Sequence, residues 1–308
     1  MGVIAGETVT PPERLPPAES PLRRFAAEFA ESRLALVGLV MLVVIVVLAL
    51  AAPVISPQNP YDLAQLDVMD SKLAPGEVSS SSGKHYLLGT DDQGRDMLSG
   101  IFYGIRISLF VGVASTVIAL SVGLVLGLAA AYFGGIVDTI IMRIADIQLS
   151  FPAILIALVL LAVLGQGVDK IIVALVTVQW AYYARTVRAS ALVERQKEYM
   201  EAAQVLALSR PRIVFRHLLP NCLPPLIVVA TVQVAHAIQL EAALSFLGLG
   251  LPITEPSIGL LISNGFQYLL SGKYWISFYP GLALLLTIVA INLVADQLRD
   301  VLNPRLKR

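Results

Sequence analysis

The chain has 308 residues, of which 56% are hydrophobic and 14% are charged, and its formal net charge is zero. With a mean hydropathy of +0.76, it is too apolar for an ordinary soluble domain, and we expect an integral membrane protein. The neutral balance offers no general basic surface for nucleic acid. The sequence holds one cysteine, Cys222, which excludes an internal disulfide and a multi-cysteine metal site.

The N-terminal 33 residues are polar and rich in proline, which predicts an extended start. Leu22, Phe25 and Phe29 then recur at helical spacing beside charged residues. We expect a short helix that lies on the membrane surface, although a helix packed on the protein itself explains the pattern equally well. A cleaved signal peptide does not fit, because the first apolar run starts at Leu34 and is long enough to span.

Residues 34–52 form an uncharged run of span length that ends at Pro53, and they predict the first transmembrane helix. The hydrophilic insert that follows has an acidic excess, which predicts an extracytoplasmic position. Its residues Asp91, Asp92 and Asp96 do not follow the spacing of a calcium loop. We interpret them as a solvated turn and a helix start, and we expect no metal site.

Further apolar runs predict five more spans. They lie at 107–133, 147–165, 171–184, 223–250 and 276–295. Basic residues outnumber carboxylates in the segment 185–221 and at the C-terminus, which places both in the cytoplasm. About six helices result, and an even number puts the N-terminus on the same side.

The segment 185–221 is strongly charged and lies between two apolar runs, so it must leave the bilayer. Good helix formers, followed by Ser209 and Pro211, predict two short helices joined by a bend. Ala202 and Ala203 give this segment a face small enough for close approach of a partner. Glu201 adds a carboxylate that could anchor it.

Glu201-Ala202-Ala203, followed by the stretch 218–221 (LLPN), resembles the EAA loop of ABC importer permeases, the membrane subunits that dock on cytoplasmic ATPases. The stretches 87–109 and 241–250 are similar to the second-type subunit of the peptide and nickel permease subfamily. The resemblance covers nearly all of the chain after its N-terminal tail. It implies a type I ABC importer permease fold, all-helical and membrane-integral. The residues that it implies in ATPase docking are Glu201, Ala202, Ala203, Ala207, Ser209, Arg212, Leu219 and Pro220.

One position departs from the family pattern, because the usual glycine four residues after the second alanine is Ala207 here. Alanine disfavours a positive φ angle, so we expect the bend to shift to Ser209 and Pro211. A lone EAA triplet would equally fit a solvated loop without a partner. The full pattern favours docking.

The sequence lacks catalytic signatures. It has no GxxxxGK[ST] loop that could cradle phosphate, no Ser, His and acid grouping and no HExxH zinc motif. We therefore expect a chain that is not catalytic by itself and binds no cofactor. The resemblance implies that ATP and magnesium are held by partner ATPase subunits.

Polar residues recur every third position in the fifth predicted span, at Gln233, His236 and Gln239, and Glu241 follows them. Such groups avoid lipid and face other helices or a wet cavity, so we predict that they line the translocation path. Interhelical hydrogen bonding that only holds the bundle together is the alternative, and for Glu241 we expect a structural role. Weaker candidates lie near predicted helix ends: Gln148, Gln179 and Asn292.

Four regions result. They are a tail with a surface helix (1–33), the first transmembrane helix with the extracytoplasmic insert (34–106), a core permease domain (107–298) that contains the docking segment 185–221, and a basic cytoplasmic C-terminus (299–308). The resemblance implies a multi-pass protein of the bacterial inner membrane that imports peptides. Its partners would be a homologous permease, two ATPase subunits, an extracytoplasmic binding protein and membrane lipid. An ion-coupled secondary transporter is the alternative, but the spans offer almost no carboxylates.

Overall fold

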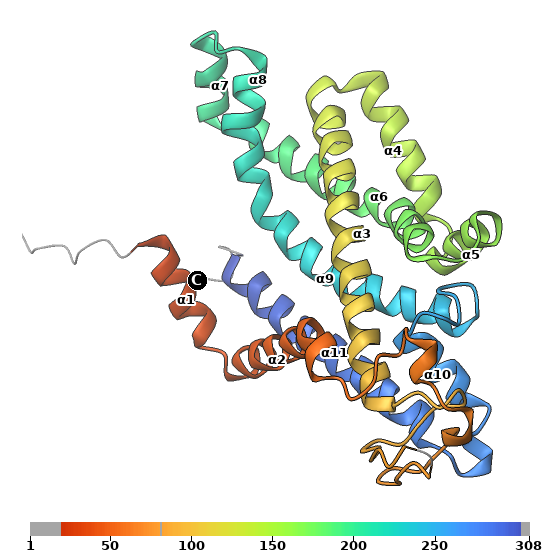
Figure 1. The fold of residues 1–308 in the computed structure, drawn as a ribbon. Helices are drawn as coiled ribbons and strands as arrows, with labels where there is room; N and C mark the ends of the chain where they lie inside the picture. The colour runs from red at the N-terminus through yellow and green to blue at the C-terminus, as the bar shows by residue number, and fades with distance from the viewer. Residues whose placement is uncertain (1–19, 81, 303–308) are drawn as a thin grey trace, which may run out of the picture.

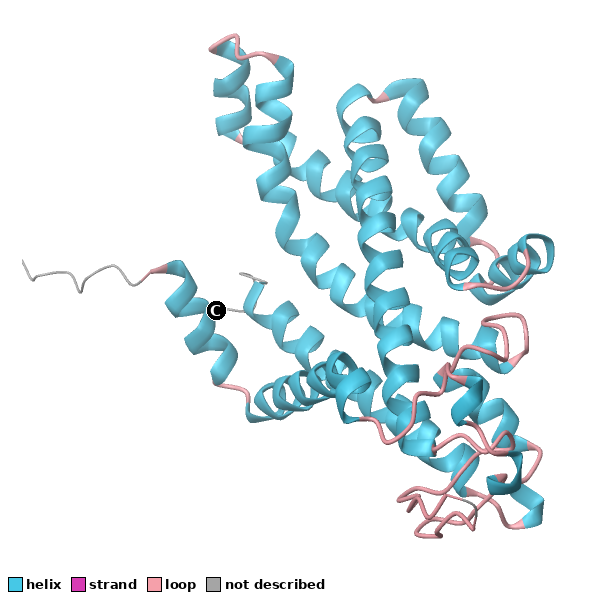
Figure 2. Cartoon of the chain, in the orientation of Figure 1, coloured by secondary structure: helices cyan, strands magenta, loops and turns pink. Residues whose placement is uncertain are grey.

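The computed structural model of the chain describes residues 20–80 and 82–302. The described residues form helices and two isolated β-bridges but no strand, as expected for an all-helical protein (Figure 2). The long helices are α2 (Arg33–Ile55), α3 (Met97–Phe133), α6 (Val168–Arg195), α9 (Leu219–Phe246) and α11 (Trp275–Leu302). Shorter helices are α1 (Pro21–Ala30), α4 (Gly135–Leu149), α5 (Ala153–Leu164), α7 (Glu198–Val205), α8 (Arg210–Arg212) and α10 (Ile258–Phe266). A π-helical turn, η3 (Ile213–Leu218), joins α8 to α9, and single 3-10 turns are η1 (Leu63–Gln65), η2 (Val68–Asp70) and η4 (Leu269–Ser271).

Within the described residues, four helical segments are long and apolar enough to cross a membrane, namely α2, α3, the continuous stretch Ile213–Phe246 and α11. The pair α4 and α5 gives a fifth span if it counts as one, but it bends by 92°. The third span predicted at 147–165 is therefore not one continuous helix, because it includes the end of α4, the break and α5. Pro152 explains the break, because it cannot donate a helical hydrogen bond and it disfavours helix in the residue before it.

The predicted fourth span, 171–184, lies inside α6, which extends further at both ends. Gln179, Tyr182 and Arg185 interrupt its apolar character, and α6 is not among the segments that meet the apolar criterion. The sequence predicts six spans, whereas four or five segments of the described residues are long and apolar enough to cross a membrane.

Helix α3 runs through the middle of the bundle (Figure 1) and packs most extensively on α6. Gly123 and Gly127 allow this close approach. A Cβ atom on Gly123 would lie 2.5 Å from Tyr183 Cβ, and one on Gly127 would lie 2.6 Å from the Ala184 carbonyl oxygen. Small residues at such contacts are typical of helix packing in membranes.

Helix α3 starts ten residues before the predicted 107, so it crosses the expected boundary between insert and core. Asp96 caps it, since its Oδ2 accepts a 2.8 Å hydrogen bond from the Ser99 backbone N–H. The helix start at Asp96 is thus as predicted, but Asp91 and Asp96 are both buried rather than solvated. At the other end of the core, α11 continues past 298 to Leu302, and residues 303–308 lie outside the described part.

The insert forms a compact cap over the ends of α2 and α3, where most of the loops gather (Figure 2). The Gln58 backbone N–H donates to Ser99 Oγ at 3.2 Å, and Gln58 Oε1 accepts from the Asp96 N–H at 2.6 Å. The Tyr86 hydroxyl donates to Asp70 Oδ2 at 3.0 Å. No group of three His, Cys, Asp or Glu side chains within the described residues is placed to hold a metal ion.

Helix α1 contacts α2 and α11. Gln297 Nε2 donates a 3.1 Å hydrogen bond to the Glu28 carbonyl oxygen, which fixes the end of α1 on α11. Packing on the protein therefore accounts for this end of the helix. Contact of its remaining face with the membrane surface stays a prediction.

Candidate functional site

The predicted docking segment projects from the bundle at the end opposite the insert, as α7 and α8 show in Figure 1. It forms two short helical pieces joined by a bend, as expected: α7, then α8 continued by η3. The expected shift of the bend to Ser209 and Pro211 is wrong. Ala207 itself adopts a positive φ of 52°, the conformation in which the family pattern places a glycine. The packing of the two helical pieces against each other thus outweighs the preference of alanine for negative φ angles.

Ala203 does not belong to a free surface. It is 4% exposed and lies in a buried cluster with Met200, Ile213 and Leu218. The expectation that it offers a face to a partner is therefore wrong, and its small size serves the packing of α7 on η3. Ala202 is exposed, because consecutive helical residues point about 100° apart.

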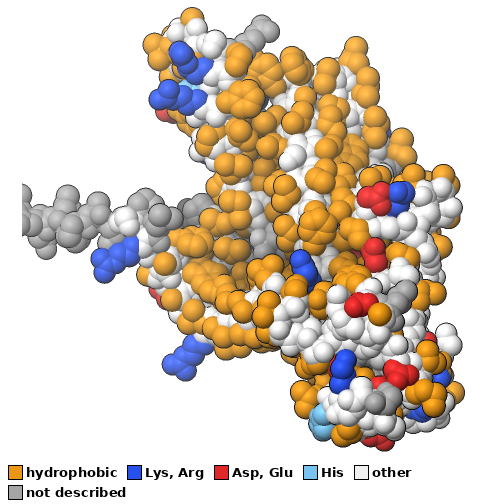
Figure 3. All heavy atoms as spheres, viewed as in Figure 1, with side chains coloured by type: hydrophobic (Ala, Val, Ile, Leu, Met, Phe, Trp, Pro, Cys, Tyr) orange, Lys and Arg blue, Asp and Glu red, His pale blue; other side chains and the backbone are white. Residues whose placement is uncertain are grey.

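The tip of the segment exposes large apolar side chains instead. Val205 is 85%, Leu206 is 73% and Phe215 is 67% exposed. Other exposed residues around them are Glu201, Ala207, Ser209, Arg212, Arg216 and Pro220, while Leu219 is half-buried. Figure 3 shows hydrophobic and basic groups together at this tip. Sequence reasoning missed Val205, Leu206 and Phe215, although apolar residues beside a predicted bend are a usable signal.

The base of the segment is held by a hydrogen-bonded network. Glu194 accepts from Lys197 Nζ and from the Tyr199 hydroxyl, each at 2.6 Å. Asn221 Nδ2 donates to the Tyr199 hydroxyl at 3.1 Å and to the His217 carbonyl oxygen at 2.7 Å. Burial raises the pKa of Tyr199 to about 12, and its bond to Glu194 adds to the rise. Burial alone would raise the Glu194 pKa, but the hydrogen bonds from Lys197 and Tyr199 outweigh it and lower that pKa. The network ties the start of α9 to α6 and α7.

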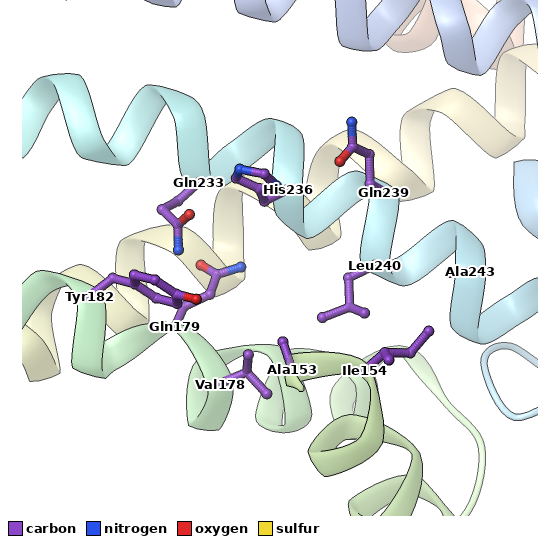
Figure 4. A pocket seen from close by; sticks show the side chains of 10 residues that line it. All are labelled: Ala153, Ile154, Val178, Gln179, Tyr182, Gln233, His236, Gln239, Leu240 and Ala243. Carbon is purple, nitrogen blue, oxygen red and sulfur yellow. The ribbon is translucent and has the colours of Figure 1, made fainter. Parts of the chain in front are cut away.

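Gln233, His236 and Gln239 line one cavity of about 370 Å³ between α9 and the helices α5 and α6 (Figure 4). The other lining residues are Ala153, Ile154, Val178, Gln179, Tyr182, Leu240 and Ala243. The structure thus brings together the three polar residues of α9 and adds Gln179 and Tyr182 from α6. No Asp, Glu, Lys or Arg side chain lines this cavity among the described residues, and its lining combines polar and apolar side chains.

Gln179 was the weaker candidate in sequence. It is 3% exposed, and its Oε1 accepts a 3.4 Å hydrogen bond from Thr116 Oγ1 on α3. In Figure 4 the Gln233 side chain extends toward Gln179 and Tyr182. No sequence pattern within α6 indicates that it faces α9, so only packing could identify this residue.

Glu241 lies elsewhere, and the prediction that it lines the same path is wrong. It is fully buried. Its Oε2 accepts from Ser108 Oγ at 2.7 Å, and its Oε1 accepts from Ser245 Oγ at 2.9 Å. The bond to Ser108 joins α9 to α3, and the bond to Ser245 lies within α9, so both carboxylate oxygens have partners, which fits the structural role that we expected.

Two family models match the chain. One describes a binding-protein-dependent transport system inner membrane component and covers residues 123–308, and the other describes the N-terminal TM domain of oligopeptide transport permease C and covers residues 20–75. The dipeptide transport system permease protein DppC of Escherichia coli is 42% identical over 289 residues, which are 94% of this chain and 95% of that protein. The di/tripeptide transport system permease protein DppC of Pseudomonas aeruginosa is 38% identical over 288 residues, 94% and 93% of the two chains.

A solved structure supports the same fold. A chain of the MetNI methionine ABC transporter in an inward-facing conformation superposes with a TM-score of 0.54 at 22% sequence identity. The match covers 67% of this chain and 98% of that chain.

Proposed function

The chain belongs to the family of binding-protein-dependent transport system inner membrane components, so it is a permease subunit of an ABC importer and not itself a catalyst, and we propose that it carries di- and oligopeptides. The peptide-transport names of its relatives support this choice of substrate. It lies in the inner membrane and works with a second permease and an ATPase.

The observation that carries the mechanism is one continuous helical stretch, Ile213–Phe246. It begins beside the exposed tip of the docking segment and carries the polar cavity residues. Phe215 and His236 are 21 positions apart on it, which corresponds to roughly 30 Å of helix. We propose that a displacement imposed at the tip reaches the cavity along this one helical stretch, which holds Pro224 and Pro225 in its interior.

We propose that the tip docks on the ATPase subunits, with Val205, Leu206 and Phe215 as the apolar anchor and Arg212 at its edge. ATP and magnesium act on those subunits, since this chain offers no phosphate loop. ATP binding draws the docked segments of the two permeases together and turns the cavity outward. Hydrolysis then resets it.

The cavity on α9 forms this chain's share of the translocation path. Gln179, Gln233 and Gln239 present amide donors and acceptors that complement the amides of a peptide main chain. A lining without Asp, Glu, Lys or Arg does not trap either charged terminus, so a peptide can enter and also leave. Substrate selection then rests mainly with an extracytoplasmic binding protein that meets the insert side. We propose that the docking segment and both termini lie on the cytoplasmic side of the membrane, and the excess of basic residues in the docking segment supports this orientation.

Docking is tested by co-purification of the permease pair with its ATPases. Substitution of Leu206→Asp or Phe215→Asp puts a charge on the exposed tip, and we expect loss of the ATPases while the permease pair stays folded. Gln196→Asp, at an exposed position at the base of the segment, is the matched control. Ala203→Asp would be uninformative, because it buries a charge within the chain.

Retention of the ATPases by both tip variants would contradict docking through this segment. Peptide uptake that needs no ATPase and is abolished by an ionophore would contradict the transport mechanism and favour an ion-coupled carrier.

A further inference from the structure

A second and larger cavity, of about 940 Å³, lies between α2 and α3. Its apolar walls are formed mainly by Val46, Ala49, Leu50, Phe110, Val113 and Val117. Both helices are long and apolar enough to cross a membrane, so this α2/α3 groove lies in the membrane-spanning part of the chain. It is separate from the polar cavity on α9.

One end of the α2/α3 groove is polar, and it carries two opposite charges. Arg106 and Glu255 both line it, yet no ion pair joins them within the described residues. Glu255 Oε2 is buried and has no hydrogen-bond partner, and Arg106 is exposed. A buried carboxylate oxygen without a partner is costly, so a cationic group of a bound molecule would stabilise Glu255, and the exposed Arg106 can pair with an anionic group.

Tyr61 also lines the groove, close enough to both charges to feel them. Burial raises the pKa of its hydroxyl to about 12, the negative Glu255 raises it further, and the positive Arg106 opposes the rise. Its ring packs edge-on against Tyr103 at a centroid distance of 5.3 Å. The loop that carries Glu255 is held by Arg95, whose Nη2 donates to the Ile253 carbonyl oxygen at 2.9 Å. The polar end therefore brings together a cation, an anion and a phenol.

The length of the groove along α3 matches the thickness of one leaflet of the bilayer core. Arg106 lies nine residues from the start of α3 at Met97, and Val46 lies nine residues from the end of α2 at Ile55. From Arg106 the apolar wall continues along α3 to Ile118, a helical rise of roughly 18 Å. Half the thickness of a bilayer core is about 15 Å. An acyl chain that starts at the polar end thus reaches the bilayer midplane within the groove.

We propose that the α2/α3 groove binds a membrane phospholipid with a zwitterionic headgroup. The phosphate pairs with the Arg106 guanidinium, the headgroup ammonium pairs with the Glu255 carboxylate, and one acyl chain lies along α2 and α3. The Tyr61 hydroxyl donates a hydrogen bond to the phosphate. A purely anionic headgroup would leave Glu255 unpaired, which is why the zwitterion fits better. The bound lipid joins α2 to the core of the permease.

The test uses the complete transporter, purified from membranes that contain phosphatidylethanolamine and phosphatidylglycerol, with mass spectrometry of the retained lipids. We expect the unaltered protein to retain phosphatidylethanolamine preferentially. Arg106→Gln should weaken retention of both lipids by about tenfold, the effect of one charged hydrogen bond. Glu255→Gln should abolish the preference for the ethanolamine headgroup while a lipid stays bound. Arg143→Gln, an exposed arginine on α4 outside the groove, is the matched control.

A second variant tests the groove independently of its charges. Val113→Trp fills the apolar wall and should displace the acyl chain with Arg106 and Glu255 intact. Equal lipid retention in Arg106→Gln and Arg143→Gln would overturn the proposal. So would a disulfide cross-link between Val113→Cys and a cysteine placed in the partner permease, because a protein chain would then occupy the groove.

Discussion

The Glu241 carboxylate on α9 accepts a 2.7 Å hydrogen bond from the hydroxyl of Ser108 on α3, 133 positions away in the sequence. The other carboxylate oxygen accepts from Ser245 at 2.9 Å. The bond to Ser108 thus connects the central helix α3 to α9, the helix that carries the cavity residues, while the bond to Ser245 lies within α9.

We expect Glu241→Ala to lower the free energy of unfolding by about 2 kcal/mol, since it leaves a cavity and two buried hydroxyls without partners. Glu241→Gln should cost under about 1 kcal/mol, because a serine hydroxyl can reorient to accept from the new amide. Thermal unfolding of the purified transporter measures both. An equal cost for the two variants would mean that the carboxylate itself, rather than its hydrogen bonds, is required.

The positive φ of Ala207 stores strain at the bend of the docking segment. Ala207→Gly should stabilise this segment by roughly 0.5–1 kcal/mol, because glycine adopts such angles without steric penalty. Ala202→Gly is the control of opposite sign, since Ala202 is an exposed residue inside α7 where glycine costs about 1 kcal/mol. Amide hydrogen exchange in α7 reports both changes. Faster exchange in Ala207→Gly would contradict the strained geometry.

The close packing of α3 on α6 predicts a strong effect at Gly123. Gly123→Ala should destabilise the protein by about 1–3 kcal/mol, because the new methyl group overlaps the Tyr183 side chain and the Trp180 carbonyl oxygen. Gly281→Ala in α11 is the matched control. Nothing lies within 4 Å of its added Cβ, so helix propensity should make it neutral or slightly favourable. Equal unfolding temperatures of the two variants would argue against this interface.

The insert should become more stable as the pH falls. Burial raises the pKa of Asp91 to about 6, against an ordinary value of 3.8, and hydrogen bonds from the Arg95 and Gln93 N–H groups only partly oppose the rise. Because the folded-state pKa lies above the unfolded one, the stability present below pH 3.8 is lost as the pH rises through about 6. Between pH 7 and pH 5 we expect a gain of about 1 kcal/mol.

Hydrogen exchange of the insert amides at the two pH values, corrected for intrinsic rates, measures this gain. Asp91→Asn keeps an acceptor for the Arg95 and Gln93 N–H groups and should flatten the pH dependence. A pH dependence unchanged by this substitution would assign the effect to another group.

The polar residues of the cavity on α9 predict a transport defect without loss of assembly. Gln233→Leu combined with His236→Leu should reduce peptide uptake into proteoliposomes about five- to tenfold, as expected for the loss of one or two hydrogen bonds to the peptide. Co-purification of the ATPases should be unchanged. Asn292→Leu, an exposed polar residue on α11 outside this cavity, is the control. Uptake that falls equally in the control would indicate a general effect of apolar substitution.

The sequence alone determined the apolar runs, the position of the docking segment and the row of Gln233, His236 and Gln239 on one face of a helix. These features follow from hydropathy and helical period, which are local properties of the chain. The helix start at Asp96 was predictable for the same reason, because a cap acts within one turn.

Only the tertiary structure decided which neighbours these local features meet. It turns Ala203 into the chain's own core, brings Gln179 into the polar cavity and turns Glu241 toward Ser108, because such contacts depend on how distant helices pack. It also fixes the positive φ at Ala207, where the packing of the two helical pieces against each other outweighs a local cost of about 1 kcal/mol. Packing energy is shared among many residues, so it can override a preference that any single residue expresses.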